Sequence, residues 1–166
     1  AGLQQPLTKT INSKNELLYF IEQTGIGKRF VIKPIWGGKG DWVMFVDIDH
    51  SAHITALWKK NKSQIERFSG SPGDYYYQVL SKQQSIDNGN SRTIKGPITW
   101  IAQEYLDLTD SDGLARDIRV IEQRDGNGIM QTSKMHGRKS SSVQIPLTNL
   151  SKGGSVCSVD QILKKT

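Results

Sequence analysis

The chain has 166 residues, of which 36% are hydrophobic and 23% are charged, and its formal net charge is +6. Its 4 tryptophans, 5 tyrosines and 4 phenylalanines exclude wholesale disorder, and its single cysteine excludes an internal disulfide and any zinc site that needs two cysteines. No apolar run approaches the ~20 residues of a membrane-spanning helix, and the cysteine content indicates a reducing, cytoplasmic setting.

The first element predicted along the chain is a helix over residues 13–24. Ser13 and Glu16 have the spacing of a capping box, which satisfies the first backbone N–H groups of a helix. Apolar residues recur on one face of this segment, and Gly25 follows it as a helix stop.

The strands that follow are predicted from β-branched and aromatic composition. Residues 29–35 and 41–47 flank the turn Gly37-Gly38-Lys39-Gly40 and predict an antiparallel hairpin. Residues 55–60 are predicted as a short helix, and residues 81–95 as an exposed polar loop. Further strands are predicted at residues 75–80, 99–106, 117–123 and 129–138.

Turn signals divide the last third of the chain. Asp125-Gly126-Asn127-Gly128 predicts a hairpin turn between the last two strands. Residues 139–142 are predicted as a flexible basic loop, and residues 149–154 as a second glycine turn. Ser158 and Gln161 are spaced to cap a final helix.

Lys33 and the glycine turn after it are the strongest candidate for chemistry. Glycines let the backbone approach an anion closely, and a lysine on the adjoining strand adds a fixed positive charge. The turn matches neither the Walker loop nor the dinucleotide-binding glycine pattern. These residues alone leave two interpretations open, a phosphate cradle and an ordinary hairpin.

A second group of candidates lies in the last third. Asp117 and Arg119 are two residues apart, so they share one face of a strand. Arg138, Asn149 and the pair Gly153-Gly154 supply a cation, an amide and a backbone open to close approach. Together they suit an anionic substrate or an acyl-phosphate, and the alternative is a basic surface with a turn.

Histidines and excess positive charge give weaker signals. His50 and His53 lie near two aspartates, but no helix signal places them as metal ligands, and His136 is predicted to be structural. The basic stretch over residues 59–67, next to Trp58, raises the alternative of nucleic-acid binding. A solvated face is the preferred interpretation of that stretch.

Taken in order, five segments resemble the ATP-grasp family, in the YheC/YheD-like bacterial branch that is associated with endospore coats. They are Val31-Ile32-Lys33-Pro34 with its glycine turn, WIAQEYL at 100–106, DIRV at 117–120, QRDGNG at 123–128 and TNLSKGG at 148–154. The resemblance covers nearly the whole chain.

That resemblance implies an α+β fold of two lobes, with antiparallel sheets, flanking helices and an incomplete C-terminal lobe. The nucleotide-binding lobe is expected at residues 1–107 and the partial second lobe at residues 108–166, with ATP held between them. The resemblance implies that Lys33 contacts the α/β phosphates and that Gly37, Gly38 and Gly40 form the phosphate lid. It places Gln103, Glu104 and Leu106 at the adenine edge, and Asp110 or Asp107 at the ribose. Contacts with the γ-phosphate and the acyl-phosphate are implied for Arg119, Arg138 and Asn149.

The implied activity is a carboxylate–amine or carboxylate–thiol ligase, in which a small-molecule or peptide carboxylate is phosphorylated by ATP before a nucleophile displaces phosphate. Magnesium would assist, but the family's acidic ligands, including Glu-x-Asn, are missing after Gly154, where Asp160 is the one acid. The chain is therefore expected to be part of a longer protein, catalytic when a downstream segment supplies the metal ligands. The alternatives are a non-catalytic spore-coat assembly module and a nucleic-acid-binding domain. A nucleotide is the expected partner, no membrane partner is expected, and the expected location is cytoplasmic or spore-associated.

Overall fold

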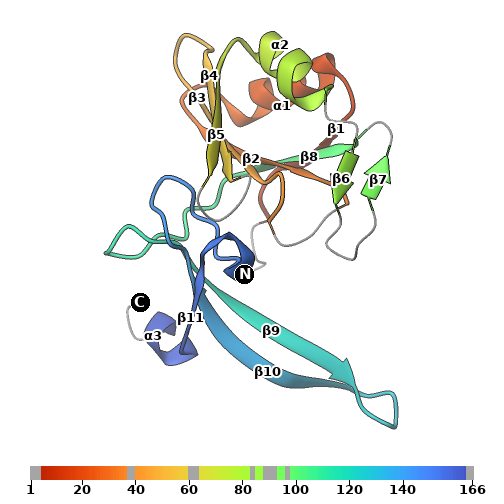
Figure 1. Ribbon diagram of the computed structural model, residues 1–166, viewed down its shortest axis with the longest axis vertical. Helices are drawn as coiled ribbons and strands as arrows, with labels where there is room; N and C mark the ends of the chain where they lie inside the picture. The colour runs from red at the N-terminus through yellow and green to blue at the C-terminus, as the bar shows by residue number, and fades with distance from the viewer. Residues whose placement is uncertain are drawn as a thin grey trace. The chain divides into compact units, whose positions relative to one another are not determined.

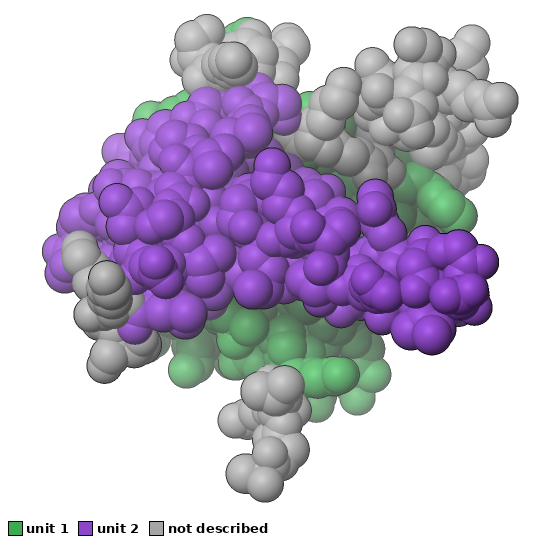
Figure 2. Space-filling view, turned by 90° about the horizontal axis from the view of Figure 1, so that it is seen from below, with its two compact units in different colours: residues 1–106 green, residues 107–166 purple. Residues whose placement is uncertain are grey.

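The computed structural model describes residues 5–36, 40–59, 64–82, 85–87, 93–95 and 98–163. The chain divides into two units, Ala1–Leu106 and Asp107–Thr166, which Figure 2 distinguishes by colour. Both are built on antiparallel sheets, and helices are few. The expected α+β class with antiparallel sheets is confirmed.

A six-stranded sheet in the order β1-β8-β2-β3-β4-β5 forms the first unit (Figure 1). Its strands are β1 (Thr8–Ile11), β2 (Arg29–Pro34), β3 (Met44–Ile48), β4 (Ile54–Lys59), β5 (Ile65–Gly70) and β8 (Trp100–Glu104). Each neighbouring pair is antiparallel, and the predicted hairpin is confirmed as β2 and β3. The segment predicted as an exposed loop instead pairs β6 (Ser85–Asp87) with β7 (Thr93–Lys95).

The core of the first unit lies on one face of this sheet. Alternate residues of the strands point into it, and Phe30, Ile32, Val46, Ala56 and Ala102 are fully buried. Helices α1 (Lys14–Thr24) and α2 (Pro72–Tyr75) lie on the same side of the sheet (Figure 1). Phe20 of α1 packs edge-to-face on Phe30, with 5.4 Å between the ring centroids. Side chains of the opposite alternation, Lys33 among them, therefore point away from the core.

The first helix forms as the sequence predicts. Ser13 is the N-cap of α1, its side chain accepts from the Glu16 N–H, and the Glu16 carboxylate accepts from the backbone of Ser13. Gly25 ends the helix at φ 93°, a conformation that favours glycine.

Two sequence predictions in this unit are wrong. The sequence predicts a short helix over residues 55–60, of which residue 60 lies outside the described residues. Residues 55–59 instead belong to β4, because Ile54, Ala56 and Trp58 bury their side chains with a period of two. Residues 75–80, predicted as a strand from their aromatic composition, lie in α2 and the π-helical turn η1 (Tyr76–Leu80). A capping serine and a proline at the first helical turn start that helix.

The second unit has a three-stranded sheet in the order β11-β10-β9. Strands β9 (Arg116–Arg124) and β10 (Met130–Lys139) form a long ribbon, and β11 (Ser155–Cys157) pairs with residues 137–139 at its base (Figure 1). The predicted hairpin turn is confirmed, because the Gly128 N–H donates to the Asp125 carbonyl at 2.9 Å.

The end of the second unit is a short helix, α3 (Val159–Leu163), which Ser158 and Gln161 cap as predicted. The loop predicted at 139–142 is confirmed for residues 140–142 and wrong for Lys139, which belongs to β10. Ser140 is buried, and its Oγ accepts from the Ala115 N–H at 3.0 Å. In the ranges that the structure describes, no helix combines the length and apolar character that crossing a membrane requires.

Candidate functional site

Lys33 and Gln103 lie together on the face of the first sheet that points away from the core. Strands β2 and β8 are paired, with Val31 directly opposite Gln103. Lys33 is two residues beyond Val31 on β2, so its side chain lies on the same face of the sheet as that of Gln103. The Lys33 Nζ donates to the Gln103 Oε1 at 3.0 Å, and the Gln103 Nε2 donates to the Thr8 Oγ1 at 3.2 Å. Two residues that the sequence analysis assigned to nucleotide binding are therefore in direct contact.

The chain leaves β8 through the segment assigned to the adenine edge. Glu104 ends the strand, and its N–H donates to the Leu7 carbonyl at 2.9 Å. Tyr105 packs edge-to-face on Phe45, with 6.1 Å between the ring centroids. Leu106 is 52% exposed. This segment thus combines an anchored strand end with an apolar side chain open to solvent.

The glycine turn is only partly within the described residues. Gly37 and Gly38 lie outside them. Gly40 has φ 77°, in the left-handed region, and Trp42 follows at φ 56°. Trp42 stacks on Trp58 with 6.2 Å between the ring centroids, which holds a conformation that costs a non-glycine residue free energy.

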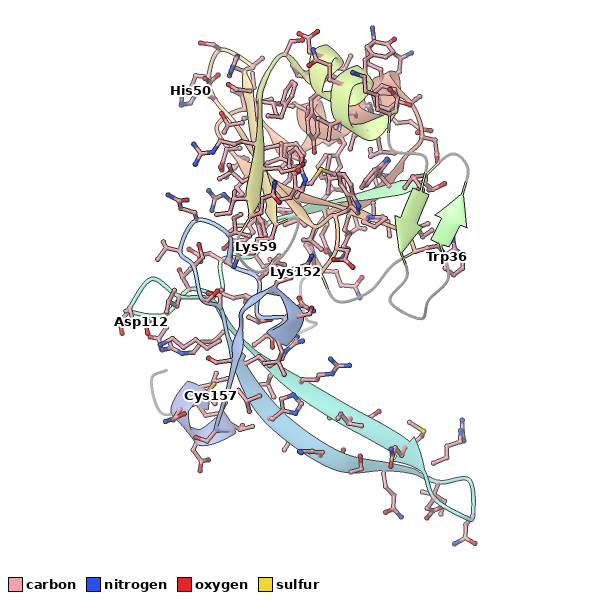
Figure 3. All side chains as sticks on the ribbon, viewed as in Figure 1. Trp36, His50, Lys59, Asp112, Lys152 and Cys157 are labelled. Atoms are coloured by element: carbon pink, nitrogen blue, oxygen red, sulfur yellow. The ribbon has the colours of Figure 1, made fainter. Side chains whose placement is uncertain are left out.

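Asp110 lies in the loop that precedes β9, in a cluster of ion pairs. Its carboxylate pairs with Arg116, and its Oδ1 accepts from the Ser111 N–H. Asp112, labelled in Figure 3, pairs with Lys139 at 2.8 Å and with Arg116 at 2.7 Å. The hydrogen bond from Lys139, together with that from the Leu114 N–H and the charge of Arg116, lowers the pKa of Asp112 below its usual value.

Arg138 is held by Asp117 at the base of the ribbon. Its Nε and Nη2 donate to the two carboxylate oxygens, each at 2.7 Å, and the Thr148 hydroxyl donates to Asp117 Oδ2 at 2.6 Å. Only 18% of the Arg138 side chain and 26% of the Asp117 side chain are exposed. This bidentate geometry fixes the guanidinium and leaves Nη1 without a role in the pair.

Arg119 lies two residues beyond Asp117 on β9, on the same face of the ribbon. In the strand register Asp117 is opposite Arg138, and Arg119 is opposite His136, so the predicted shared face of Asp117 and Arg119 is confirmed. Within the described ranges, no side chain makes an ion pair or a hydrogen bond with the Arg119 guanidinium. Arg138 is thus compensated by Asp117, whereas no described side chain compensates the charge of Arg119.

Asn149 starts a tight turn that ends at Gly154. Its carbonyl accepts from the Lys152 N–H at 2.9 Å and from the Gly154 N–H at 3.0 Å. Gly153 has φ 94°. A Cβ atom on Gly154 would lie 2.3 Å from the Thr148 carbonyl oxygen, so only glycine fits there. The glycine turn predicted over residues 149–154 is therefore present, and its approach to an anionic ligand stays a prediction.

His136 is a residue whose surroundings the sequence analysis missed. Its Nδ1 is shielded from solvent and has no hydrogen-bond partner in the part of the chain that the structure describes. The two-residue spacing from Arg138 predicts that they share a face. That Arg119 lies directly across from His136 depends on the register of the hairpin, which the sequence does not specify.

Magnesium, which the family chemistry implies, does not fit these residues. Among the described residues, no three side chains of histidine, cysteine, aspartate or glutamate gather where they could hold a metal ion. Asp112 and Asp117 are bound by basic side chains, and Asp160 lies in the first turn of α3. We therefore assign no step to magnesium in this chain.

The family resemblance of the five motifs is confirmed by comparison with known families. The family model described as YheC/D like ATP-grasp matches residues 4–166. No curated protein and no solved structure matches the chain. ATP-grasp membership implies ATP binding and, in general terms, ATP-dependent ligase-type activity. Because the match extends over almost the entire sequence, this chain belongs to the YheC/D-like ATP-grasp family.

Proposed function

We propose that the chain is the ATP-binding part of an ATP-grasp ligase that joins a carboxylate to an amine or a thiol. The family match over residues 4–166 is the observation that carries this proposal. In the proposed reaction the carboxylate attacks the γ-phosphorus, an acyl-phosphate forms as ADP leaves, and the nucleophile then displaces inorganic phosphate. Such chemistry depends mainly on positioning and on compensating the charge of the phosphoryl group.

In the first unit, Lys33 is proposed to contact the α- and β-phosphates. Its ammonium group points away from the core and is oriented by Gln103, which supports this role. The turn containing Gly37, Gly38 and Gly40 is proposed to cover the phosphates, and the backbone of residues 103–106 is proposed to bind the adenine edge.

In the second unit, Arg119 is proposed to bind the terminal phosphoryl group, because its guanidinium is uncompensated among the described side chains. Arg138 is proposed to donate to the same phosphoryl group through Nη1, because its Nε and Nη2 already donate to Asp117. Asn149 is proposed to contact the acyl-phosphate, and Asp110 the ribose. We propose that the two units correspond to the two lobes of the family.

Calorimetric titration with ATP tests the proposal. Lys33→Ala should weaken ATP binding by about 10- to 100-fold, because a hydrogen bond to a charged group contributes about 1.5–3 kcal/mol. The matched control is Lys28→Ala, which removes an exposed lysine just before β2 and should leave the affinity within about twofold. Equal affinities of the wild-type chain and Lys33→Ala, or no ATP binding by the wild-type chain, would contradict the proposal.

A further inference from the structure

Strand β1 forms one edge of the six-stranded sheet. It pairs with β8 on one side, and within the described ranges no strand pairs with its other side. Thr8, Lys9 and Thr10 are exposed, and Ile11 at the end of the strand is buried. An edge strand of this kind presents backbone groups that can pair with a further strand.

The hydrogen bonds between β1 and β8 show which backbone groups point outward. The Glu104 N–H donates to the Leu7 carbonyl, directly beyond the register pair of Thr8 with Gln103. In antiparallel strands such bonds recur at every second residue. The N–H and C=O groups of Thr8 and Thr10 therefore point away from β8, spaced to bond a neighbouring strand.

A groove of about 420 Å³ lies between this edge and helix α1. Lys9 and Thr10 line it from β1, and Asn15, Glu16 and Tyr19 line it from α1. A strand added to β1 would place alternate side chains on the face of the sheet that α1 covers, and hence in this groove. Addition of an extended peptide to a sheet edge, with pockets for alternate side chains, is a recurrent mode of peptide recognition.

Lys9 sets the charge of the groove. Its ammonium group makes no ion pair and no hydrogen bond with a described residue. The Glu16 carboxylate, the acid of the groove, accepts from the N–H groups of Asn12 and Ser13 at the start of α1. In a strand added antiparallel to β1, the residue opposite Lys9 shares its face, and opposite charges attract in that position. An acidic side chain is therefore favoured there.

A second copy of the chain fits this edge less well. Two β1 strands related by a two-fold axis pair antiparallel, and the register that uses the outward groups of both threonines places Thr8 opposite Thr10. Lys9 would then lie directly opposite Lys9 of the partner subunit, and like charges in that position destabilise the pairing. A lysine in the middle of the edge thus opposes self-pairing and favours an acidic strand.

We propose that the outer edge of β1 binds an extended acidic segment of a separate polypeptide, which adds antiparallel to β1. The backbone of Thr8 and Thr10 bonds the segment, and one of its acidic side chains lies in the groove beside Lys9. This docking site belongs to the first unit alone. It goes beyond the proposed function and does not depend on ATP binding.

Amide hydrogen exchange of the full chain, followed by NMR, tests the inference. The probe is the pentapeptide acetyl-Thr-Val-Glu-Val-Thr-amide, whose central glutamate would lie opposite Lys9. The matched probe has lysine in place of that glutamate. Each is added at about 5 mM, which suits a site with a Kd of about 1 mM.

The glutamate peptide should slow the exchange of the Thr8 and Thr10 amides by about fivefold, because occupancy protects them in proportion to the bound fraction. The lysine peptide should slow it by less than about twofold, since its charge opposes Lys9. Both amides should exchange rapidly in the chain without peptide.

Two variants separate the contributions of charge and backbone. Lys9→Glu should exchange the preference between the two peptides, and Lys28→Glu, a reversal at an exposed lysine before β2, should keep it. Thr10→Pro removes an outward N–H that β8 does not use, a position where an edge strand accepts proline. It should reduce the protection of Thr8 to less than about twofold, and circular dichroism checks that the variant is folded.

Three outcomes would overturn the inference. They are no protection by the glutamate peptide, equal protection by both peptides, and an unchanged preference in Lys9→Glu. Protection that rises with protein concentration in the absence of peptide would also overturn it, because that would indicate pairing between copies of the chain. None of these results bears on the calorimetric test of ATP binding, so the two proposals fail independently.

Discussion

Gly154 shows how strictly a single position can be constrained. The Thr148 carbonyl oxygen, a backbone atom just before the turn that starts at Asn149, would lie 2.3 Å from a Cβ at this site. Because backbone atoms cannot rotate away as a side chain can, the turn must deform to accept any larger residue. Glycine is thus required at position 154 because there is no room for a Cβ atom.

We expect Gly154→Ala to lower the free energy of unfolding by about 3 kcal/mol, the upper part of the range for overpacking. Urea denaturation followed by circular dichroism provides the measurement. Gly126→Ala is the control, since a Cβ there meets nothing within 4 Å, and it should cost less than about 1 kcal/mol. Similar costs at the two positions would show that the steric argument is wrong.

Two bidentate ion pairs differ mainly in their exposure. The Arg138 and Asp117 side chains are 18% and 26% exposed, whereas those of Arg29 and Asp47 are 33% and 43% exposed. Asp117 also accepts from Thr148, which adds a third hydrogen bond to the more buried pair. The hydrogen bond from Arg29 to Asp47 raises the pKa of Arg29.

Double-mutant cycles should reflect this difference. The coupling energy between Arg138→Met and Asp117→Ala is expected at about 2 kcal/mol, and that between Arg29→Met and Asp47→Ala at about 0.5 kcal/mol, because water screens the more exposed pair. The free energies of unfolding of the single and double variants give both values. A larger coupling for the pair on β2 and β3 would contradict the argument.

At the scale of an element, ion pairs hold the loop between β8 and β9. Arg116 binds both Asp110 and Asp112, and Lys139 of β10 also binds Asp112. A backbone bridge between Thr109 and Ala115 closes the same loop. The acidic composition of this segment therefore serves to fasten it to two strands.

The lowered pKa of Asp112 predicts how this loop responds to pH. Its carboxylate stabilises the fold fully above the pKa of an unfolded aspartate, about 3.9, and the contribution is lost as the pH falls through the lower folded pKa. Asp112→Asn should therefore lower the Tm at pH 7, by an amount that stays constant down to about pH 5 and shrinks below about pH 4.

Thermal unfolding of both proteins between pH 2.5 and 7 would measure this. Lys139→Met, which removes the donor with the largest effect, should lower the Tm over the same pH window. A difference between wild type and Asp112→Asn that grows as the pH falls would reverse the sign and refute the assignment.

At the scale of the whole molecule, apolar burial is unevenly shared. The extended cluster of buried hydrophobic residues belongs to the first unit. In the second, several large apolar side chains of the ribbon are exposed, among them Val120 at 47% and Met135 at 54%. Local stability follows local burial, so the two parts should differ in how readily their hydrogen bonds open.

Hydrogen exchange should show this difference directly. Amides of β2 and β3, which have neighbouring strands on both sides, are expected to exchange at least about a hundredfold more slowly than those of residues 122–131 at the outer end of the ribbon. Exchange followed by NMR or mass spectrometry is the measurement. Equal protection of the two segments would contradict the expectation.

Features formed by residues close together in the chain could be predicted from the sequence alone. The capping box of α1 and the turn after Asp125 involve residues at most four apart, so each could be predicted without the rest of the chain. The order of five motifs likewise indicated the family. Short-range hydrogen bonds and the pattern of apolar residues are written directly in the sequence.

Tertiary structure decided the elements that local patterns leave ambiguous. Residues 54–59 became a strand because β3 and β5 pair with them on both sides. Three contacts of the candidate site join separate strands. They are the hydrogen bond between Lys33 and Gln103, the ion pair between Arg138 and Asp117, and the placement of His136 opposite Arg119. Side-chain neighbours across a sheet depend on register, and register is set when strands pair over one hydrophobic face.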